Sequence, residues 1–142
     1  MKALILISIF SMSFTFAKSL MIAPETETSS GCDLEVAGFN EKESFLKFFP
    51  LLKEAVKTKD PKKISPFMLY PFKVNGKTTI KIKNAQEFEA KFKTLITEKI
   101  IVVISNQKIE DLFCQYQGVM FGDGEVWVQK INGKVGISAI NP

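Results

Sequence analysis

The chain of 142 residues contains neither histidine nor arginine, and all nineteen of its basic residues are lysines. Without histidine it can form no Ser-His-Asp or Cys-His catalytic arrangement and no histidine-ligated zinc site. Without arginine it has no planar guanidinium group to hold a carboxylate or phosphate in a bidentate pair. It also lacks a glycine-rich phosphate-binding motif. These absences exclude several common enzyme classes, and we expect no cofactor and no bound metal.

The N-terminal segment has the pattern of a secretory signal peptide. Lys2 precedes an apolar stretch that ends at Ala17, and we predict cleavage after that residue. The apolar run covers about 14 residues, fewer than the ~20 that a membrane-spanning helix needs. We therefore predict an exported chain whose mature part has no transmembrane segment.

The remaining composition indicates one globular domain, with 46% hydrophobic and 24% charged residues. After removal of residues 1–17, 18 lysines face 15 acidic residues, and these lysines are dispersed along the chain. A nucleic-acid surface is instead typically a clustered basic face, often with arginine. We therefore expect no nucleic-acid partner.

The two cysteines, Cys32 and Cys114, are the only candidates for covalent cross-linking. An even number of cysteines in an exported chain favours a disulfide. Closing a loop of about 82 residues would contribute roughly 4–5 kcal/mol in the chain-entropy model. The alternative is lipidation at Cys32, because Ser30-Gly31-Cys32 faintly resembles a lipoprotein processing site; it would leave Cys114 unpaired.

Local patterns divide the mature chain into a flexible arm, residues 18–40, and a domain, residues 41–142. Apolar spacing predicts helices over residues 41–58, 61–65 and 85–97, the first kinked at Pro50. Asn75-Gly76 predicts a tight type I′ hairpin, and a strand meander follows Leu112. The β-branched run 99–105 fits a strand or a short buried helix, and periodicity does not decide between them.

Two tracts carry a family resemblance: DLFCQYQGVMFGDGEVWV, residues 111–128, and Tyr70-Pro71-Phe72 followed by Val74-Asn75-Gly76. They resemble small exported bacterial proteins of the nuclear-transport-factor-2-like, cystatin-related superfold. The resemblance covers about residues 41–141 and implies an α+β fold in which a bent antiparallel sheet wraps around N-terminal helices as a cone. It also implies a bacterial envelope location, periplasmic or extracellular. Enzymes of this group often use Asp and His in the cone pocket, and this chain has no His.

One face of the predicted meander supplies the candidate site residues. Polar and aromatic side chains there could line a cone pocket, although such alternation is also typical of the wet face of an antiparallel sheet. The candidate ligand-binding residues are Tyr70, Gln115, Tyr116, Gln117, Trp127 and Gln129. Asp111 and Glu125 are weaker candidates for a carboxylate acid or base.

The sequence therefore predicts an exported, non-enzymatic binding module. Its partner would be a small molecule, a cell-wall fragment or an envelope protein. One alternative is an isomerase- or hydrolase-like enzyme with a carboxylate base of raised pKa. The other is an envelope inhibitor or immunity-type protein.

Overall fold

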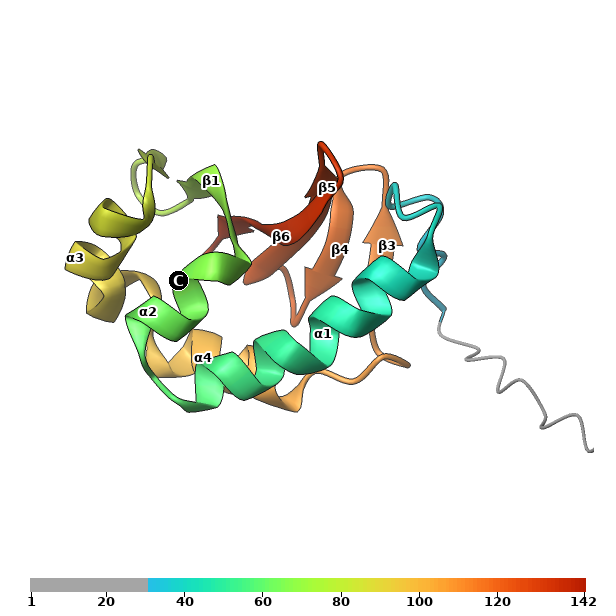
Figure 1. Cartoon of the computed structure of the whole chain (residues 1–142), viewed down its shortest axis with the longest axis horizontal. Coiled ribbons are helices and arrows are strands. Elements are labelled where there is room, and N and C mark those ends of the chain that lie inside the picture. Colours follow the sequence, from blue (N-terminus) through green and yellow to red (C-terminus); the bar gives the residue numbers. More distant parts are fainter. Residues whose placement is uncertain (1–30) are drawn as a thin grey trace, which may run out of the picture.

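A computed structural model describes residues 31–142, which form four helices and a six-stranded sheet (Figure 1). The predicted signal peptide and residues 18–30 of the predicted arm lie outside the described residues. Within residues 31–142, no helix has both the length and the apolar character needed to cross a membrane.

The helices begin where the sequence offers caps. Asp60 accepts a hydrogen bond from the backbone N–H of Lys62 and Asn84 from that of Glu87, so each supplies an acceptor to a helix start. Pro50 lies inside the first helix. The helices are α1 (Lys42–Lys57), α2 (Pro61–Ile64), α3 (Ala85–Leu95) and α4 (Glu98–Asn106), with a 3-10 turn at Ser65–Phe67 after α2.

The ambiguous run 99–105 is helical and forms most of α4. Thr97 caps this helix by accepting a hydrogen bond from the backbone N–H of Ile100. Ile100, Ile101 and Ile104 are buried, and α4 packs along α1. The spacing of these isoleucines places them on one side of a helix, so tertiary burial prevails over their strand propensity.

The sheet is mixed, so the prediction of an antiparallel sheet is wrong for one pair of strands. Its order is β2-β1-β6-β5-β4-β3, and β1 runs parallel to β6 while every other neighbouring pair is antiparallel. Parallel neighbours need a long connection, which the intervening helices and strands provide. The strands are β1 (Met68–Val74), β2 (Ile80–Ile82), β3 (Phe113–Gln115), β4 (Gly118–Phe121), β5 (Val126–Ile131) and β6 (Lys134–Ile140).

The two Asn-Gly sequences behave differently. Asn132 and Gly133 have φ values of 50° and 78° and form the two-residue turn between β5 and β6. The tight turn predicted at Asn75-Gly76 is wrong, because Val74 pairs with Ile80 and residues 75–79 form a longer loop. The backbone N–H of Asn75 donates instead to the carbonyl of Ile140, 2.9 Å away, which links this loop to β6.

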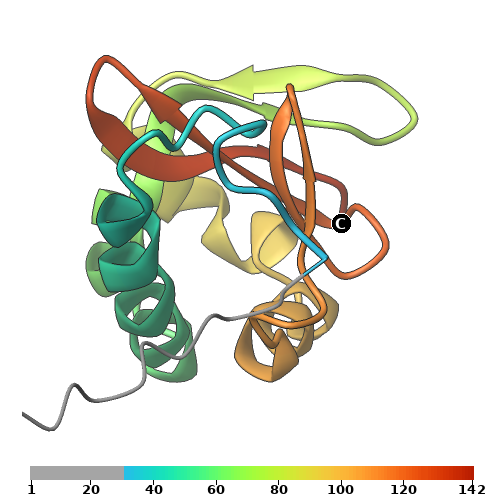
Figure 2. The ribbon, with the colours of Figure 1, turned by 90° about the vertical axis from the view of Figure 1, so that its right-hand side faces the viewer.

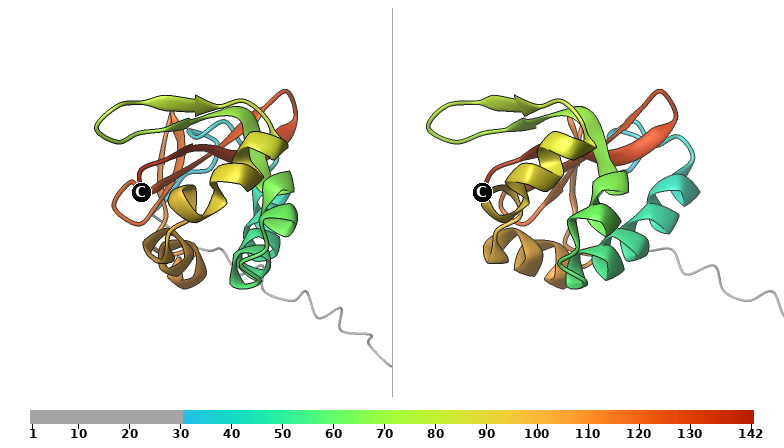
Figure 3. Two further views of the ribbon diagram at one scale, coloured as in Figure 1. Left: turned by 90° about the vertical axis from the view of Figure 1, so that its left-hand side faces the viewer. Right: turned by 60° about the vertical axis from the view of Figure 1, so that its left-hand side comes forward.

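The helices cover one face of the twisted sheet (Figures 2 and 3). Aromatic side chains fill the space between the two layers. The Phe121 ring of β4 lies 6.4 Å from that of Phe45 and 5.4 Å from that of Phe49, both on α1. This inner face is thus occupied by the core, and a ligand site must be sought elsewhere.

A disulfide joins Cys32 to Cys114, as predicted. It attaches the start of the described chain to β3, at one edge of the sheet. Residues 31–40 pack onto the core here, with Leu34, Ala37 and Phe39 buried. The Phe39 ring meets that of Phe45 edge to face at 5.3 Å.

Candidate functional site

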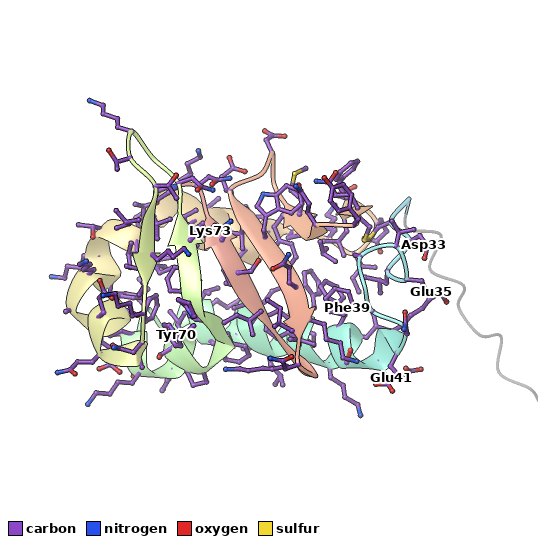
Figure 4. The ribbon with its side chains drawn as sticks, turned by 90° about the horizontal axis from the view of Figure 1, so that it is seen from above. Asp33, Glu35, Phe39, Glu41, Tyr70 and Lys73 are labelled. Carbon is purple, nitrogen blue, oxygen red and sulfur yellow. A yellow bond between two sulfur atoms is a disulfide. The ribbon has the colours of Figure 1, made fainter. Side chains whose placement is uncertain are left out.

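The face of the sheet that points away from the helices carries a hollow of about 270 Å³. Figure 4 looks onto this face, where Lys73 is labelled. We call this site the outer-face hollow. Its lining residues are Lys73, Asn75, Gln117, Trp127, Gln129, Ser138 and Ala139.

Strand pairing explains why the hollow exists. Trp127 of β5 lies opposite Ala139 of β6, and Ala139 lies beside Lys73 of β1. Residues paired in this way project on the same side of a sheet. The small side chain of Ala139 therefore leaves a gap between the ammonium group of Lys73 and the indole of Trp127.

An irregularity in β6 shapes the floor of the hollow. Trp127 pairs with Ala139, whereas the next residue, Val128, pairs with Ile137, so Ser138 is an extra residue in the ladder. The hydroxyl of Ser138 donates to the carbonyl oxygen of Trp127 at 3.3 Å. Bulges of this kind redirect side chains and occur often beside functional sites.

Two glutamines close the side of the hollow next to the β3–β4 turn. The side-chain amide of Gln129 donates to the backbone oxygen of Gln117 at 2.7 Å. Gly118 makes this approach possible: its φ is +123°, and a Cβ there would lie 2.9 Å from Cγ of Gln129 and would clash with the carbonyl of Val128. The Gln129 side chain is therefore held by a backbone contact.

The lining contains a cationic group and neutral polar groups but no acidic group. It offers an ammonium group, three amides, a hydroxyl and an indole N–H, and no aspartate or glutamate belongs to it. The indole adds a flat apolar wall. Such a lining suits a ligand that combines a ring with several hydroxyl or other oxygen acceptors.

Three of the six predicted ligand-binding residues, Gln117, Trp127 and Gln129, line this hollow. Gln115 touches it indirectly, since its side-chain amide donates to the Oε1 atom of Gln117 at 3.0 Å. Tyr116 lies outside it, with 81% of its surface exposed.

Tyr70 also lies elsewhere. Its hydroxyl is 2.8 Å from that of Ser65, and its ring packs near Phe72 and Phe88. Burial raises the pKa of its phenol above the ordinary value. These contacts make Tyr70 part of the packing beside α3.

Sequence reasoning missed Lys73, Asn75, Ser138 and Ala139. All four lie on β1, on β6 or in the loop after β1. They join the hollow because β6 pairs with β1, two strands that are separated by some sixty residues of chain. The alternation in each strand was visible in the sequence, but the pairing partner was not.

The two candidate catalytic carboxylates are arranged differently. The Glu125 carboxylate accepts a hydrogen bond from the Asp123 N–H at 2.7 Å and lies 3.2 Å from Lys99 Nζ, with its side chain only 13% exposed. A hydrogen bond from its own backbone N–H, with those of Asp123 and Lys99, lowers the pKa of Glu125 despite its burial. The enzymatic alternative requires a raised pKa there. Asp111 is exposed, on the rim of another hollow beside Asn106 and Asp123.

A larger hollow, about 740 Å³, is a groove between α2, α3 and α4. Phe92, Ile96 and Ile101 contribute its apolar lining. Two of its lysines are already neutralised: Lys59 pairs with Glu98 at 2.7 Å and Lys91 with Glu87 at 2.8 Å. Glu89 and Lys93 also line the groove and make no ion pair within residues 31–142, so this lining carries both signs of charge, whereas the outer-face hollow has a cation and no carboxylate.

The described residues offer no group of three or more Asp, Glu or Cys side chains placed to hold a metal ion. Among known proteins, no family model, no curated protein and no solved structure matches the chain, so its function has to be argued from the geometry of the outer-face hollow.

Proposed function

We propose that this protein is an exported, non-enzymatic binding module that holds a saccharide of the cell envelope in the outer-face hollow. Export rests on the signal-peptide pattern of residues 1–17 and agrees with a disulfide between Cys32 and Cys114. The single observation that carries the ligand class is the lining itself, an indole wall surrounded by hydrogen-bonding side chains without a carboxylate.

Each part of the lining has a role in this proposal. The indole of Trp127 covers the apolar face of a sugar ring. The amides of Asn75, Gln117 and Gln129 bind ring hydroxyls, which both donate and accept hydrogen bonds. The glutamine amides are partly fixed before the ligand arrives, which reduces the entropy lost on binding.

Membership of the nuclear-transport-factor-2-like superfold and its cone architecture are part of the same proposal. A twisted sheet over several helices supports it (Figure 2). The binding mode would then depart from a cone pocket, because aromatic residues occupy the inner face and the ligand lies on the outer face.

Trp127 is the single tryptophan of the chain, so its fluorescence reports directly on this hollow. We expect oligosaccharides of N-acetylglucosamine, or of related envelope sugars, to cause a saturable change in emission from the oxidised mature protein. Gln129→Ala should weaken binding about fivefold, the loss of one hydrogen bond. Calorimetry with the same sugars gives a second reading of affinity.

The matched control is Gln86→Ala, which removes the same amide from an exposed position on α3. It should leave the affinity unchanged. The proposal fails if no saccharide, neutral or acidic, gives a saturable signal, or if the two glutamine variants weaken binding equally.

A further inference from the structure

We infer that the ligand is an acidic saccharide whose carboxylate or phosphate is bound by Lys73 and Lys81, at the end of the outer-face hollow formed by β1 and β2. This inference rests on the proposed function and specifies the charge of its ligand. It follows from the charge distribution of the β1–β2 hairpin and from the register of the sheet.

The lysines are less evenly spread than the overall composition indicates. Residues 61–86 contain six lysines and no aspartate or glutamate. This segment includes the whole β1–β2 hairpin, which extends to one side of the molecule (Figure 3). The hairpin therefore creates a local positive potential that attracts anions.

Lys73 and Lys81 form the centre of this charge. They are directly opposite each other on the antiparallel strands β1 and β2, and both are exposed. Like charges in facing positions destabilise a sheet unless an anion lies between them. A bound acidic group would remove that repulsion, so it would interact with both lysines at once.

Within residues 31–142 no carboxylate already serves this purpose. Six ion pairs occur there, and their lysines lie on α1, α3, α4 and β5 and, for Lys59, in the connection between α1 and α2. None of the six involves Lys73 or Lys81. Lys73, which lines the hollow, and Lys81, its partner on β2, thus have no carboxylate partner within the described part of the chain.

Strand register aligns this pair of charges with the indole. Paired positions form one continuous row over the outer face, with cations at one end, the indole in the middle and an exposed phenylalanine at the other end. The row is Lys81, Lys73, Ala139, Trp127, Met120 and Phe113. Since neighbouring strands lie about 4.8 Å apart, the backbones at Lys73 and Trp127 are separated by roughly 10 Å.

The separation between Lys73 and Trp127 suggests how an acidic sugar would lie in the hollow. The gap above Ala139 accommodates one sugar ring, which lies against Trp127 while its acidic substituent points to Lys73 and Lys81. A peptide or lipid anion without a sugar ring would use the lysines but leave the indole and amides unfilled. The combination of both groups in one row favours the acidic saccharide.

Binding of four probes by the oxidised mature protein tests the inference. They are trigalacturonate, a carboxylated saccharide; glucosamine 6-phosphate, a phosphorylated one; chitotriose, a neutral saccharide; and triglutamate, an acidic chain without sugar rings. We expect at least one acidic sugar to bind ten or more times tighter than chitotriose and triglutamate in low salt. The better of the two acidic sugars identifies the acidic group.

The double variant Lys73→Gln, Lys81→Gln should remove this preference, so that the acidic sugars bind the variant no tighter than chitotriose binds the same variant. Both side chains are exposed, and circular dichroism verifies that the variant folds. Lys47→Gln is the matched control, because Lys47 is exposed on α1 and makes no ion pair within residues 31–142. It should retain the full preference.

The outcomes separate this inference from the proposed function. Equal affinity for neutral and acidic sugars overturns the inference and leaves the saccharide-binding proposal intact. Binding of triglutamate as tight as that of the acidic sugars overturns the inference, since plain charge attraction would then suffice. If none of the three sugars binds, both proposals fail.

Discussion

The two faces of the sheet come from the same strands but differ in every respect that matters for function. Along β5, Val126 and Val128 point to the helices and are fully buried, whereas Trp127 and Gln129 between and after them point outward. The inner face meets phenylalanines of α1 and is filled. The outer face meets solvent and carries hydrogen-bonding side chains. Alternation in one strand thus places one set of side chains in the core and the other set in the outer-face hollow.

The largest expected effect tests the difference between the two faces of the sheet with substitutions at two neighbouring residues of β4. Phe121→Ala should lower the free energy of unfolding by about 3–5 kcal/mol, because a fully buried ring is lost between Phe45 and Phe49. Met120→Ala, on the outer face, should cost less than about 1 kcal/mol. Urea denaturation of both variants with the disulfide intact measures the difference, and similar costs would contradict a division between the faces.

A smaller effect concerns the turn that joins β4 to β5. Glu125→Gln should cost about 1–2 kcal/mol near neutral pH, since an ionised acceptor is lost from the Asp123 N–H and from Lys99. The folded-state pKa of Glu125 is below the ordinary value of 4.5. Its stabilisation is therefore complete above the pKa of the unfolded chain and is lost as the pH falls through the lowered folded pKa.

Urea denaturation between pH 7 and pH 3 follows this dependence. The difference between the wild-type protein and Glu125→Gln should shrink on acidification. Glu110→Gln is the control, because Glu110 is exposed and has no ion pair within the described residues. A difference that stays constant down to pH 3 would show that the carboxylate is not held in its ionised form.

The smallest expected effect concerns the outer face of the sheet, where a substitution should increase the stability of the protein instead of reducing it. Lys81→Gln should raise the free energy of unfolding by about 0.2–1 kcal/mol, because it relieves the repulsion with Lys73. The gain should decrease in high salt, which screens exposed charges. Thermal denaturation with no ligand measures it, and a loss of stability would mean that Lys81 has a structural role.

Much of the fold was predictable because its signals are local. The caps at Asp60 and Asn84 mark helix starts, and Asn132-Gly133 marks a two-residue turn. Each of these depends on residues a few positions apart. Whether residues 99–105 form a helix or a strand was undecided from the sequence, since the isoleucines of α4 are buried against α1, more than forty residues earlier in the chain.

Only the part of the candidate site that belongs to the C-terminal strand meander was predictable from the sequence. Gln117, Trp127 and Gln129 belong to a meander whose alternation is visible in the sequence. Lys73 and Ala139 depend on the parallel pairing of β1 with β6, for which the sequence carries no local signal. The misjudged turn at Asn75-Gly76 has the same origin, because Asn75 bonds to the carbonyl of Ile140 in β6.

The position of β6 also has a consequence for the order in which the molecule can be completed. It is the last strand along the described chain, yet it lies inside the sheet between β1 and β5. During synthesis, the β2-β1 pair and the β5-β4-β3 meander have no direct strand pairing with each other until residues 134–140 emerge. The six-stranded sheet can therefore be completed only when this last strand is available.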